Sequence, residues 1–273
     1  MKLLGWDTSS KSGALVAIEW DESSRQGWQG VRVVCEWQLS VELTHSERLL
    51  WAIDETLRSA RWKLEEVGAF AVGVGPGSFT GVRVGVTTAR TLAHTLDKPL
   101  IGVSSLAALA RPAAAWLALS KDPALVVATT DAAKGELFSL WGAARSVQDC
   151  AAMAEGDRPG LWKRGVEEQV LAPGALVRVL RRKLSLEKKM KWLTVGEGRK
   201  RYADAWSELP RARELQARAP GIDQVQGRYL GMLAWEAWQA GLGRDALLVH
   251  PRYLRAADAE VKLKAGLLKP APV

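Results

Sequence analysis

The seven residues Gly75-Pro-Gly-Ser-Phe-Thr-Gly81 constrain this chain more than any other stretch. Three glycines and a proline in seven residues predict a sharp turn with an accessible backbone. The turn follows the apolar run 69–74 and precedes 82–95, which is predicted to form a helix. In open α/β folds, such a turn between a strand and a helix N-terminus often binds an anion. We therefore expect an α/β domain built around this turn.

The spacing excludes two common phosphate loops. A Walker A loop needs a lysine just before the helix, and no lysine lies between Gly75 and Arg83. A dinucleotide-binding fingerprint needs a glycine at the position of Thr80. Two interpretations stay open, a phosphate site of another kind and a purely structural turn.

The pattern of apolar residues around the turn predicts a regular order of elements. A capping box from Thr44 to Glu47 starts an amphipathic helix that ends near Ala60, and Ser104 or Ser105 is expected to cap a later one. In chain order, the predicted elements are strands 2–7, 13–19 and 31–39, helix 44–60, strand 69–74, helix 82–95, strand 100–103 and a helix to about 119.

A second, similar unit is predicted to begin with strands 125–130 and 137–141. Asp131 would then correspond to Asp7, because each follows the first strand of its unit. The later pattern is less regular. It predicts a basic helix over 176–191, a strand over 192–195, a helix over 224–240 and a fraying tail.

The amino-acid sequence of the glycine turn is distinctive. GPGSFTGVRVGV followed by KPLIGVSSLAALA resembles the TsaB (YeaZ) family, bacterial partners of the tRNA threonylcarbamoyladenosine synthase. LLGWDTSS, HSERLL, DAAKGELF and PRYLR extend the resemblance over most of residues 1–140 and a short patch near the end. It implies an α/β fold of two ribonuclease-H-like subdomains, as in the actin, Hsp70 and sugar-kinase (ASKHA) superfamily, with the second one reduced or divergent. We expect these subdomains at 1–107 and 108–255, with a tail at 256–273.

The first strand ends in Asp7-Thr8-Ser9-Ser10, which resembles the first phosphate loop of that superfamily. In its kinases such an aspartate holds Mg²⁺ through water, whereas the simpler interpretation is a residue that caps a β-turn. The candidate phosphate or nucleotide loops comprise Asp7, Thr8, Ser9, Gly75, Gly77, Ser78, Thr80, Gly81 and Asp131.

Several catalytic groups are missing from the sequence. Catalytic relatives of the family carry an iron-binding HxxxH motif after the strand KPLIGV, and its histidines would fall at Ser105 and Leu109. The three histidines present are not spaced as a helical metal pair, and no GxSxG motif occurs. Cys35 and Cys150 suggest neither a disulfide scaffold nor a zinc site. We expect no metal, no cofactor and no catalytic residue, and a cytoplasmic protein without a membrane span.

The positive charge is localised. Residues 158–218 hold 16 Lys/Arg against 7 Asp/Glu, whereas the whole chain holds 38 against 30. Such a segment favours contact with a polyanion, although solvated basic helices are also common. The candidate tRNA contacts are Arg178, Arg181, Arg182, Lys183, Lys188, Lys189 and Lys191.

The resemblance also implies a use for the two helices that flank the turn, because in the family they pair with a partner of the same fold. The expected interface comprises His45, Leu49, Leu50, Ile53, Leu57, Val82, Val86, Ala89, Leu92 and Ala93. The alternative is that these apolar stripes pack on their own sheet.

The sequence therefore predicts a non-catalytic subunit of the tRNA threonylcarbamoyladenosine synthase. Its expected partners are a TsaD-type transferase and a TsaE-type ATPase, with self-association when alone. Two alternatives stay open, an ATP-dependent phosphotransferase using Asp7 and Asp131, and a stand-alone basic RNA-binding module.

Overall fold

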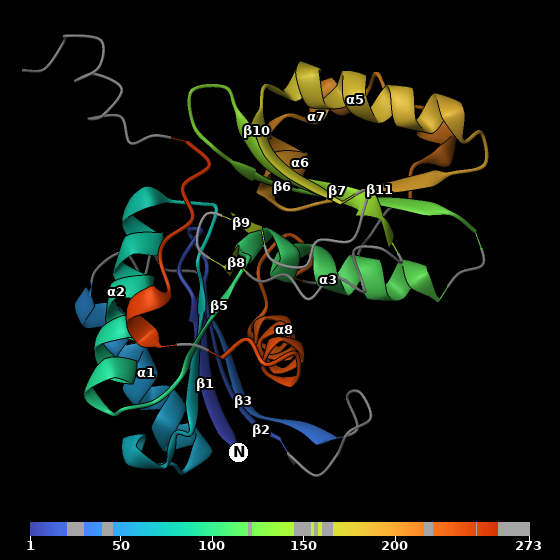
Figure 1. Cartoon of the computed structure of the whole chain (residues 1–273). Helices are drawn as coiled ribbons and strands as arrows, with labels where there is room; N and C mark the ends of the chain where they lie inside the picture. Colours follow the sequence, from blue (N-terminus) through green and yellow to red (C-terminus); the bar gives the residue numbers. More distant parts are fainter. Residues whose placement is uncertain are drawn as a thin grey trace, which may run out of the picture.

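The computed structural model describes residues 1–20, 30–39, 46–119, 122–144, 154–155, 158–159, 166–215, 221–243 and 245–255. Two mixed β-sheets form the framework, and helices lie on both faces of each (Figure 1). His45, Thr44 and the tail 256–273 lie outside the described residues.

The first sheet has the strand order β3-β2-β1-β4-β5. Its strands are β1 (Lys2–Asp7), β2 (Gly13–Trp20), β3 (Val31–Leu39), β4 (Ala69–Gly73) and β5 (Leu100–Val103). The first three form an antiparallel meander, whereas β4 and β5 run parallel to β1. This order and these directions are those of a ribonuclease-H-like unit, which confirms the predicted fold of the first half.

Helices cover both faces of this sheet (Figure 1). On one face, α1 (Ser46–Ala60) and α2 (Phe79–Thr95) bury an apolar core with the short 3₁₀ turn η4 (Ala246–Leu248). On the other face, α8 (Gly227–Gln239) packs against β1 and β2 and contacts α3 (Ser105–Ala118). The return of α8 and η4 to the first sheet corrects the expected boundary at 108–255, because the chain after residue 221 completes the first subdomain.

The second sheet repeats the first in a shortened form. Its order is β10-β7-β6-β11, with β7 antiparallel to β6 and β11 parallel to it. Its strands are β6 (Ala124–Asp131), β7 (Leu137–Ala143), β10 (Glu167–Leu171) and β11 (Lys191–Val195). Four strands occupy the places of β3, β2, β1 and β4, and the sheet has no counterpart of β5 among the described residues. The second subdomain is therefore reduced, as expected.

Helices also sandwich this sheet. α3 lies on its inner face, between the two sheets, and α5 (Pro173–Leu186) lies on its outer face (Figure 1). The remaining short elements are η2 (Leu64–Glu66), β8 (Ala154–Glu155), β9 (Arg158–Pro159), α6 (Glu197–Arg201), α7 (Ala203–Trp206) and η3 (Arg211–Arg213).

Some helix boundaries differ from those predicted. α2 begins at Phe79 rather than 82, because the Ser78 hydroxyl accepts from the Gly81 amide and caps the helix inside the glycine turn. α5 begins at Pro173 and ends at Leu186, whereas the basic stretch predicted a helix to 191. Ser104 is the N-cap of α3. No helix in the described part of the chain is long and apolar enough to cross a bilayer.

Candidate functional site

The glycine turn packs directly against the loop that follows β1. A Cβ atom added at Gly77 would lie 2.3 Å from the carbonyl oxygen of Ser9, and one at Gly81 would lie 2.1 Å from that of Thr8. The Ser78 amide donates to the Ser9 carbonyl at 2.7 Å. These glycines are needed because two backbone segments approach each other with no room for a side chain between them. The contacts favour the structural interpretation of the turn.

Asp7 is fully buried at the end of β1. Its Oδ1 accepts from the Ser9 amide at 2.9 Å and from the Ser9 hydroxyl at 2.6 Å, and its Oδ2 accepts from the Ser105 hydroxyl. Burial raises the pKa of Asp7, and the hydrogen bonds from Ser105 and Ser9 oppose that rise. Both carboxylate oxygens thus serve the protein interior, where they join β1 to the start of α3.

The positions implied for an iron-binding HxxxH motif are built into the core. The Ser105 hydroxyl accepts from the Gly75 amide at 3.1 Å and donates to Asp7, so it joins the turn to the β1 loop. Leu109 is buried one turn further along α3, in the core between the sheets. A hydroxyl engaged in this way and an aliphatic side chain do not fit an iron ion. No group of three metal-ligating side chains occurs among the residues that the structure describes.

A polar cleft lies between the two subdomains. One part, of about 420 Å³, brings together Ser9, Ser78, Thr80 and Asp131. An adjoining part, of about 460 Å³, shares Lys11 and Arg201 with it and extends to Asp223. The other predicted loop residues do not line either part, namely Asp7, Thr8, Gly75, Gly77 and Gly81. The structure therefore brings only part of the predicted set together.

The charges in the cleft are largely balanced. Asp131 contacts the Arg201 guanidinium at 3.3 Å and accepts from the Tyr202 hydroxyl at 3.0 Å. Burial, reinforced by the bond to Asp131, raises the pKa of Tyr202, which keeps this hydroxyl protonated as a donor. Asp223 contacts Arg199 at 2.6 Å and Lys200 at 3.4 Å. Because carboxylates accompany these cations, the cleft offers no strongly positive cradle for a triphosphate.

The expected partner interface needs a correction. Most of its residues face the protein's own sheet and are buried: Leu49, Ile53, Leu57, Val82, Val86, Ala89 and Ala93. Leu92 is half-buried against the same core, and among the predicted interface residues that the structure describes only Leu50 is clearly exposed. His45 lies outside the described residues. The apolar stripes thus hold α1 on β2 and β3 and hold α2 on β4, β1 and β5, so any partner would bind the opposite sides of the helices.

Those opposite sides carry their own apolar residues. Six of the twelve large apolar side chains exposed in the described part of the chain belong to α1, α2, η4 and the segment after η4: Leu50, Trp51, Phe79, Leu247, Leu248 and Tyr253. The rings of Phe79 and Tyr253 stack with centroids 4.9 Å apart, and the Arg83 guanidinium lies 4.4 Å from the Phe79 ring. We call these six residues and the outward side of α2 the outer face.

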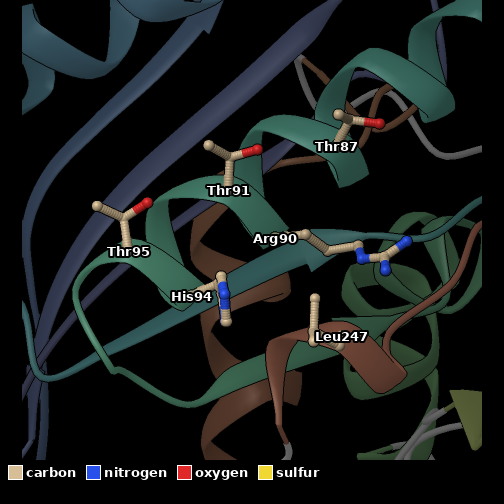
Figure 2. Close-up of a pocket in the computed structure, with 6 residues that line it drawn as sticks. All are labelled: Thr87, Arg90, Thr91, His94, Thr95 and Leu247. Carbon is tan, nitrogen blue, oxygen red and sulfur yellow. The ribbon is translucent and has the colours of Figure 1, made fainter.

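Figure 2 shows the outward side of α2 beside η4. Thr87, Thr91 and Thr95 follow one another along the helix, and Arg90 and His94 lie on the side of the helix nearer Leu247 (Figure 2). A shallow pocket of about 240 Å³ lies among these side chains. The outer face therefore combines exposed apolar groups with hydrogen-bonding groups, as protein–protein interfaces do.

The predicted tRNA contacts separate into two groups. Lys183 pairs with Glu187 at 3.1 Å, and Lys191 pairs with Asp122 at 2.7 Å. The other five are exposed and form no ion pair within the described residues: Arg178, Arg181, Arg182, Lys188 and Lys189.

Sequence reasoning missed one buried polar cluster that joins the subdomains. Glu168 on β10 accepts from the Ser104 hydroxyl at 2.7 Å and forms an ion pair with Arg252. The Arg252 amide donates to the Val74 carbonyl at 2.8 Å, next to the glycine turn. Arg252 belongs to the PRYLR motif, which was a usable signal, whereas nothing in the sequence around Glu168 marks it.

The two sheets, their strand orders and the reduced second unit place the chain in the ASKHA structural class. The comparisons with known proteins narrow this class. Residues 40–262 match the profile of the family described as TsaD: tRNA N6-adenosine threonylcarbamoyltransferase. The Escherichia coli (strain K12) tRNA threonylcarbamoyladenosine biosynthesis protein TsaB is 34% identical over 219 residues, which cover 80% of this chain and 84% of that protein.

The protein of the same name from Haemophilus influenzae is 35% identical over 212 residues, covering 78% of this chain and 80% of that protein. The structure of YeaZ from Pseudomonas aeruginosa superposes with a TM-score of 0.65 at 27% identity, over 93% of this chain and 99% of that one. The chain belongs to the TsaB family.

Proposed function

We propose that this chain is a non-catalytic subunit in the synthesis of threonylcarbamoyladenosine in tRNA, and that it acts by binding a TsaD-type transferase. The relatives named for this biosynthesis support the process. In this proposal the transferase moves threonylcarbamoyl from its adenylate onto N6 of the adenosine 3′ of the anticodon, and a TsaE-type ATPase joins the assembly.

The observation that carries the proposal is the outer face. Large apolar side chains exposed together on a folded protein mark surfaces that bind other proteins. Trp51 is 58% exposed although it lies on a helix whose inward side is fully packed. A partner that covers the outward sides of α1, α2 and η4 would remove these groups from water. A stable interface of this kind buries about 1,600 Å² in total.

The site near the glycine turn supports a non-catalytic role. Asp7 is sealed by Ser9 and Ser105, and Ser105 and Leu109 stand where the resemblance implies metal ligands. The chain's contribution is then differential binding, since a subunit that prefers the active conformation of its partner increases the population of that conformation. The phosphotransferase alternative lacks support, because its first carboxylate does not line the cleft.

A matched pair of tryptophans tests the docking proposal. Trp51 on α1 and Trp116 on α3 are similarly exposed, at 58% and 54%, and only Trp51 lies on the outer face. We expect Trp51→Glu to weaken binding of the TsaD-type transferase from the same organism about 30-fold, since a central tryptophan contributes about 2 kcal/mol or more. Trp116→Glu should bind normally. Affinity is measured by isothermal titration calorimetry, with melting temperatures as the folding control.

Equal affinities of the two variants, or an equal loss in both, would contradict the proposal. Sedimentation of the chain alone adds a second measurement. If the free chain self-associates, we expect Trp51→Glu to dissociate it and the transferase to compete with self-association, because both would use the outer face.

A further inference from the structure

The outward side of α5 concentrates positive charge that the fold does not use. Its inward side packs Leu176, Val177, Leu180 and Leu184 against the second sheet. Arg178, Arg181 and Arg182 follow the i, i+3, i+4 spacing that places side chains on one side of a helix. Lys188 and Lys189 continue the exposed charge beyond the C-terminus of α5. We call these five residues the basic face.

The basic face is held in a fixed shape. The Arg213 guanidinium donates from Nη1 to the carbonyl oxygens of Leu184, Glu187 and Lys188, at 3.0, 3.2 and 3.1 Å. This side chain caps the last turn of α5 and anchors the backbone that carries Lys188 and Lys189. A cationic surface on a rigid backbone loses less conformational entropy when it binds than a mobile chain would.

The charges of the basic face are available to a ligand. Lys183 and Lys191 in the same segment are paired with Glu187 and Asp122, whereas the five residues of the basic face form no ion pair within the described part of the chain. Of these five, Lys189 lies near enough to Asp122 to help the Lys191 hydrogen bond lower the pKa of that carboxyl. Clustered, unpaired cations attract polyanions, and each phosphate that they neutralise releases a condensed counterion.

We propose that the basic face binds the phosphate backbone of the tRNA substrate. This inference rests on the proposed function, which supplies a tRNA. An anionic membrane is the less suitable partner, because a helix on a membrane inserts its apolar side and that side of α5 is already buried in the core. Phosphate contacts carry no sequence information, so this surface orients the tRNA without selecting it.

The basic face and the outer face lie on different outer layers of the molecule. α5 covers the side of the second sheet that points away from the first sheet. α1 and α2 cover the side of the first sheet that points away from the second (Figure 1). A bound transferase on the outer face therefore leaves α5 accessible, and the two surfaces are separately testable.

The test compares two double variants that each remove two positive charges from the same segment. Arg181→Gln/Arg182→Gln changes the basic face, and Lys183→Gln/Lys191→Gln changes only paired lysines. Binding of a fluorescein-labelled, unmodified tRNA transcript to the full chain is followed by fluorescence anisotropy between 50 and 200 mM KCl. We expect the first variant to bind about tenfold more weakly at 50 mM and its log–log salt slope to fall by about 2. The second should stay within about twofold of the wild type.

No binding of tRNA by the wild type at 50 mM KCl, or an equal loss in both variants, would overturn the inference. So would binding to phosphatidylserine vesicles without binding to tRNA. Transferase affinity is measured on the same variants and should not change. Failure of the docking proposal would appear in the transferase affinities, whereas failure of the tRNA-binding proposal would appear in the anisotropy. The two results are therefore distinguishable.

Discussion

The Asp7 carboxylate accepts three hydrogen bonds from Ser9 and Ser105 and has no exposed surface. A carboxylate that held a metal through water would need at least one oxygen directed at solvent. Asp131 ends the equivalent strand of the second sheet but faces the cleft and pairs with Arg201. Two aspartates at matching positions thus have different environments, and both oxygens of the first one are hydrogen-bonded inside the protein.

Asp7 should make stability depend on pH in a definite direction. Its pKa is raised above the usual 3.8 by burial, so above about pH 4 Asp7 is more protonated in the folded state than in the unfolded chain. The contribution of Asp7 to the free energy of unfolding therefore falls as the pH rises through this window. Asn cannot ionise. We therefore measure the free energy of unfolding of Asp7→Asn and of the wild type with urea. The difference, variant minus wild type, should increase between pH 4 and 7.

Asp122→Asn is the control for this measurement. The hydrogen bond from Lys191 lowers the pKa of Asp122, so the contribution of Asp122 to stability is lost only below about pH 4 and should stay nearly constant between pH 4 and 7. A difference between Asp7→Asn and the wild type that stays constant from pH 4 to 7 would show that residue 7 is ionised in the folded protein and in the unfolded chain alike.

The glycine turn gives a second test at this scale. A methyl group at Gly81 would meet the backbone of Thr8, which has no flexible end to move away. We expect Gly81→Ala to lower the free energy of unfolding by about 1–3 kcal/mol. In Gly174→Ala, on α5, the nearest atom would be the end of Arg178 at 3.7 Å, so this control should be neutral or slightly stabilising. Equal urea midpoints for the two variants would rule out close approach as the reason for Gly81.

At the scale of elements, α1 shows what an apolar pattern reveals. The periodicity predicted the helix and its stripe, because a 3.6-residue repeat reports which side of a helix is apolar. It does not report what that side faces. Leu49 is buried against the sheet while its neighbour Leu50 is half-exposed. Only the position of the sheet in the structure distinguishes these two leucines.

The same pair predicts a contrast in stability. Leu49→Ala would empty a core position and should cost about 2–5 kcal/mol. Leu50→Ala should stay within about 0.5 kcal/mol, because half of its surface is already in water. Thermal and urea unfolding check both values. Similar losses for the two residues would mean that the outer face is covered within the free chain.

Other elements show where the sequence signal ends. β1, β3 and β5 were predicted with their observed bounds, since alternating or continuous apolar residues between turn residues mark strands. β10 was not predicted, because Glu167-Glu-Gln-Val-Leu171 is a polar edge strand held by pairing with β7 rather than by its own pattern. The sealed environment of Asp7 depends on Ser105, 98 residues away, and no local pattern predicts such a contact.

At the scale of the whole molecule, the Glu168–Arg252 pair joins the second sheet to the segment beside the glycine turn. The Glu168 side chain is 1% exposed and that of Arg252 is 16% exposed. Removing one partner leaves a buried charge without compensation, so Glu168→Gln or Arg252→Gln should each cost about 3 kcal/mol. The double variant should lose clearly less than the sum.

A double-mutant cycle from urea unfolding measures this coupling. Glu66→Gln, which removes the exposed partner of Lys2, serves as a control and should have almost no effect. Strict additivity of the Glu168 and Arg252 variants would indicate that the two side chains act independently and that other contacts hold the subdomains together.

Reconstituted tRNA modification can test our proposal that this chain acts by docking and performs no chemistry. Incorporation of labelled threonylcarbamoyl into tRNA is measured with the TsaD-type and TsaE-type proteins of the same organism, with and without this chain, and with the chain alone. We predict no incorporation by the chain alone, full stimulation by folded Asp7→Asn, and loss of stimulation by Trp51→Glu. Incorporation by the chain alone, or stimulation that is lost in Asp7→Asn, would show that the chain takes part in the chemistry.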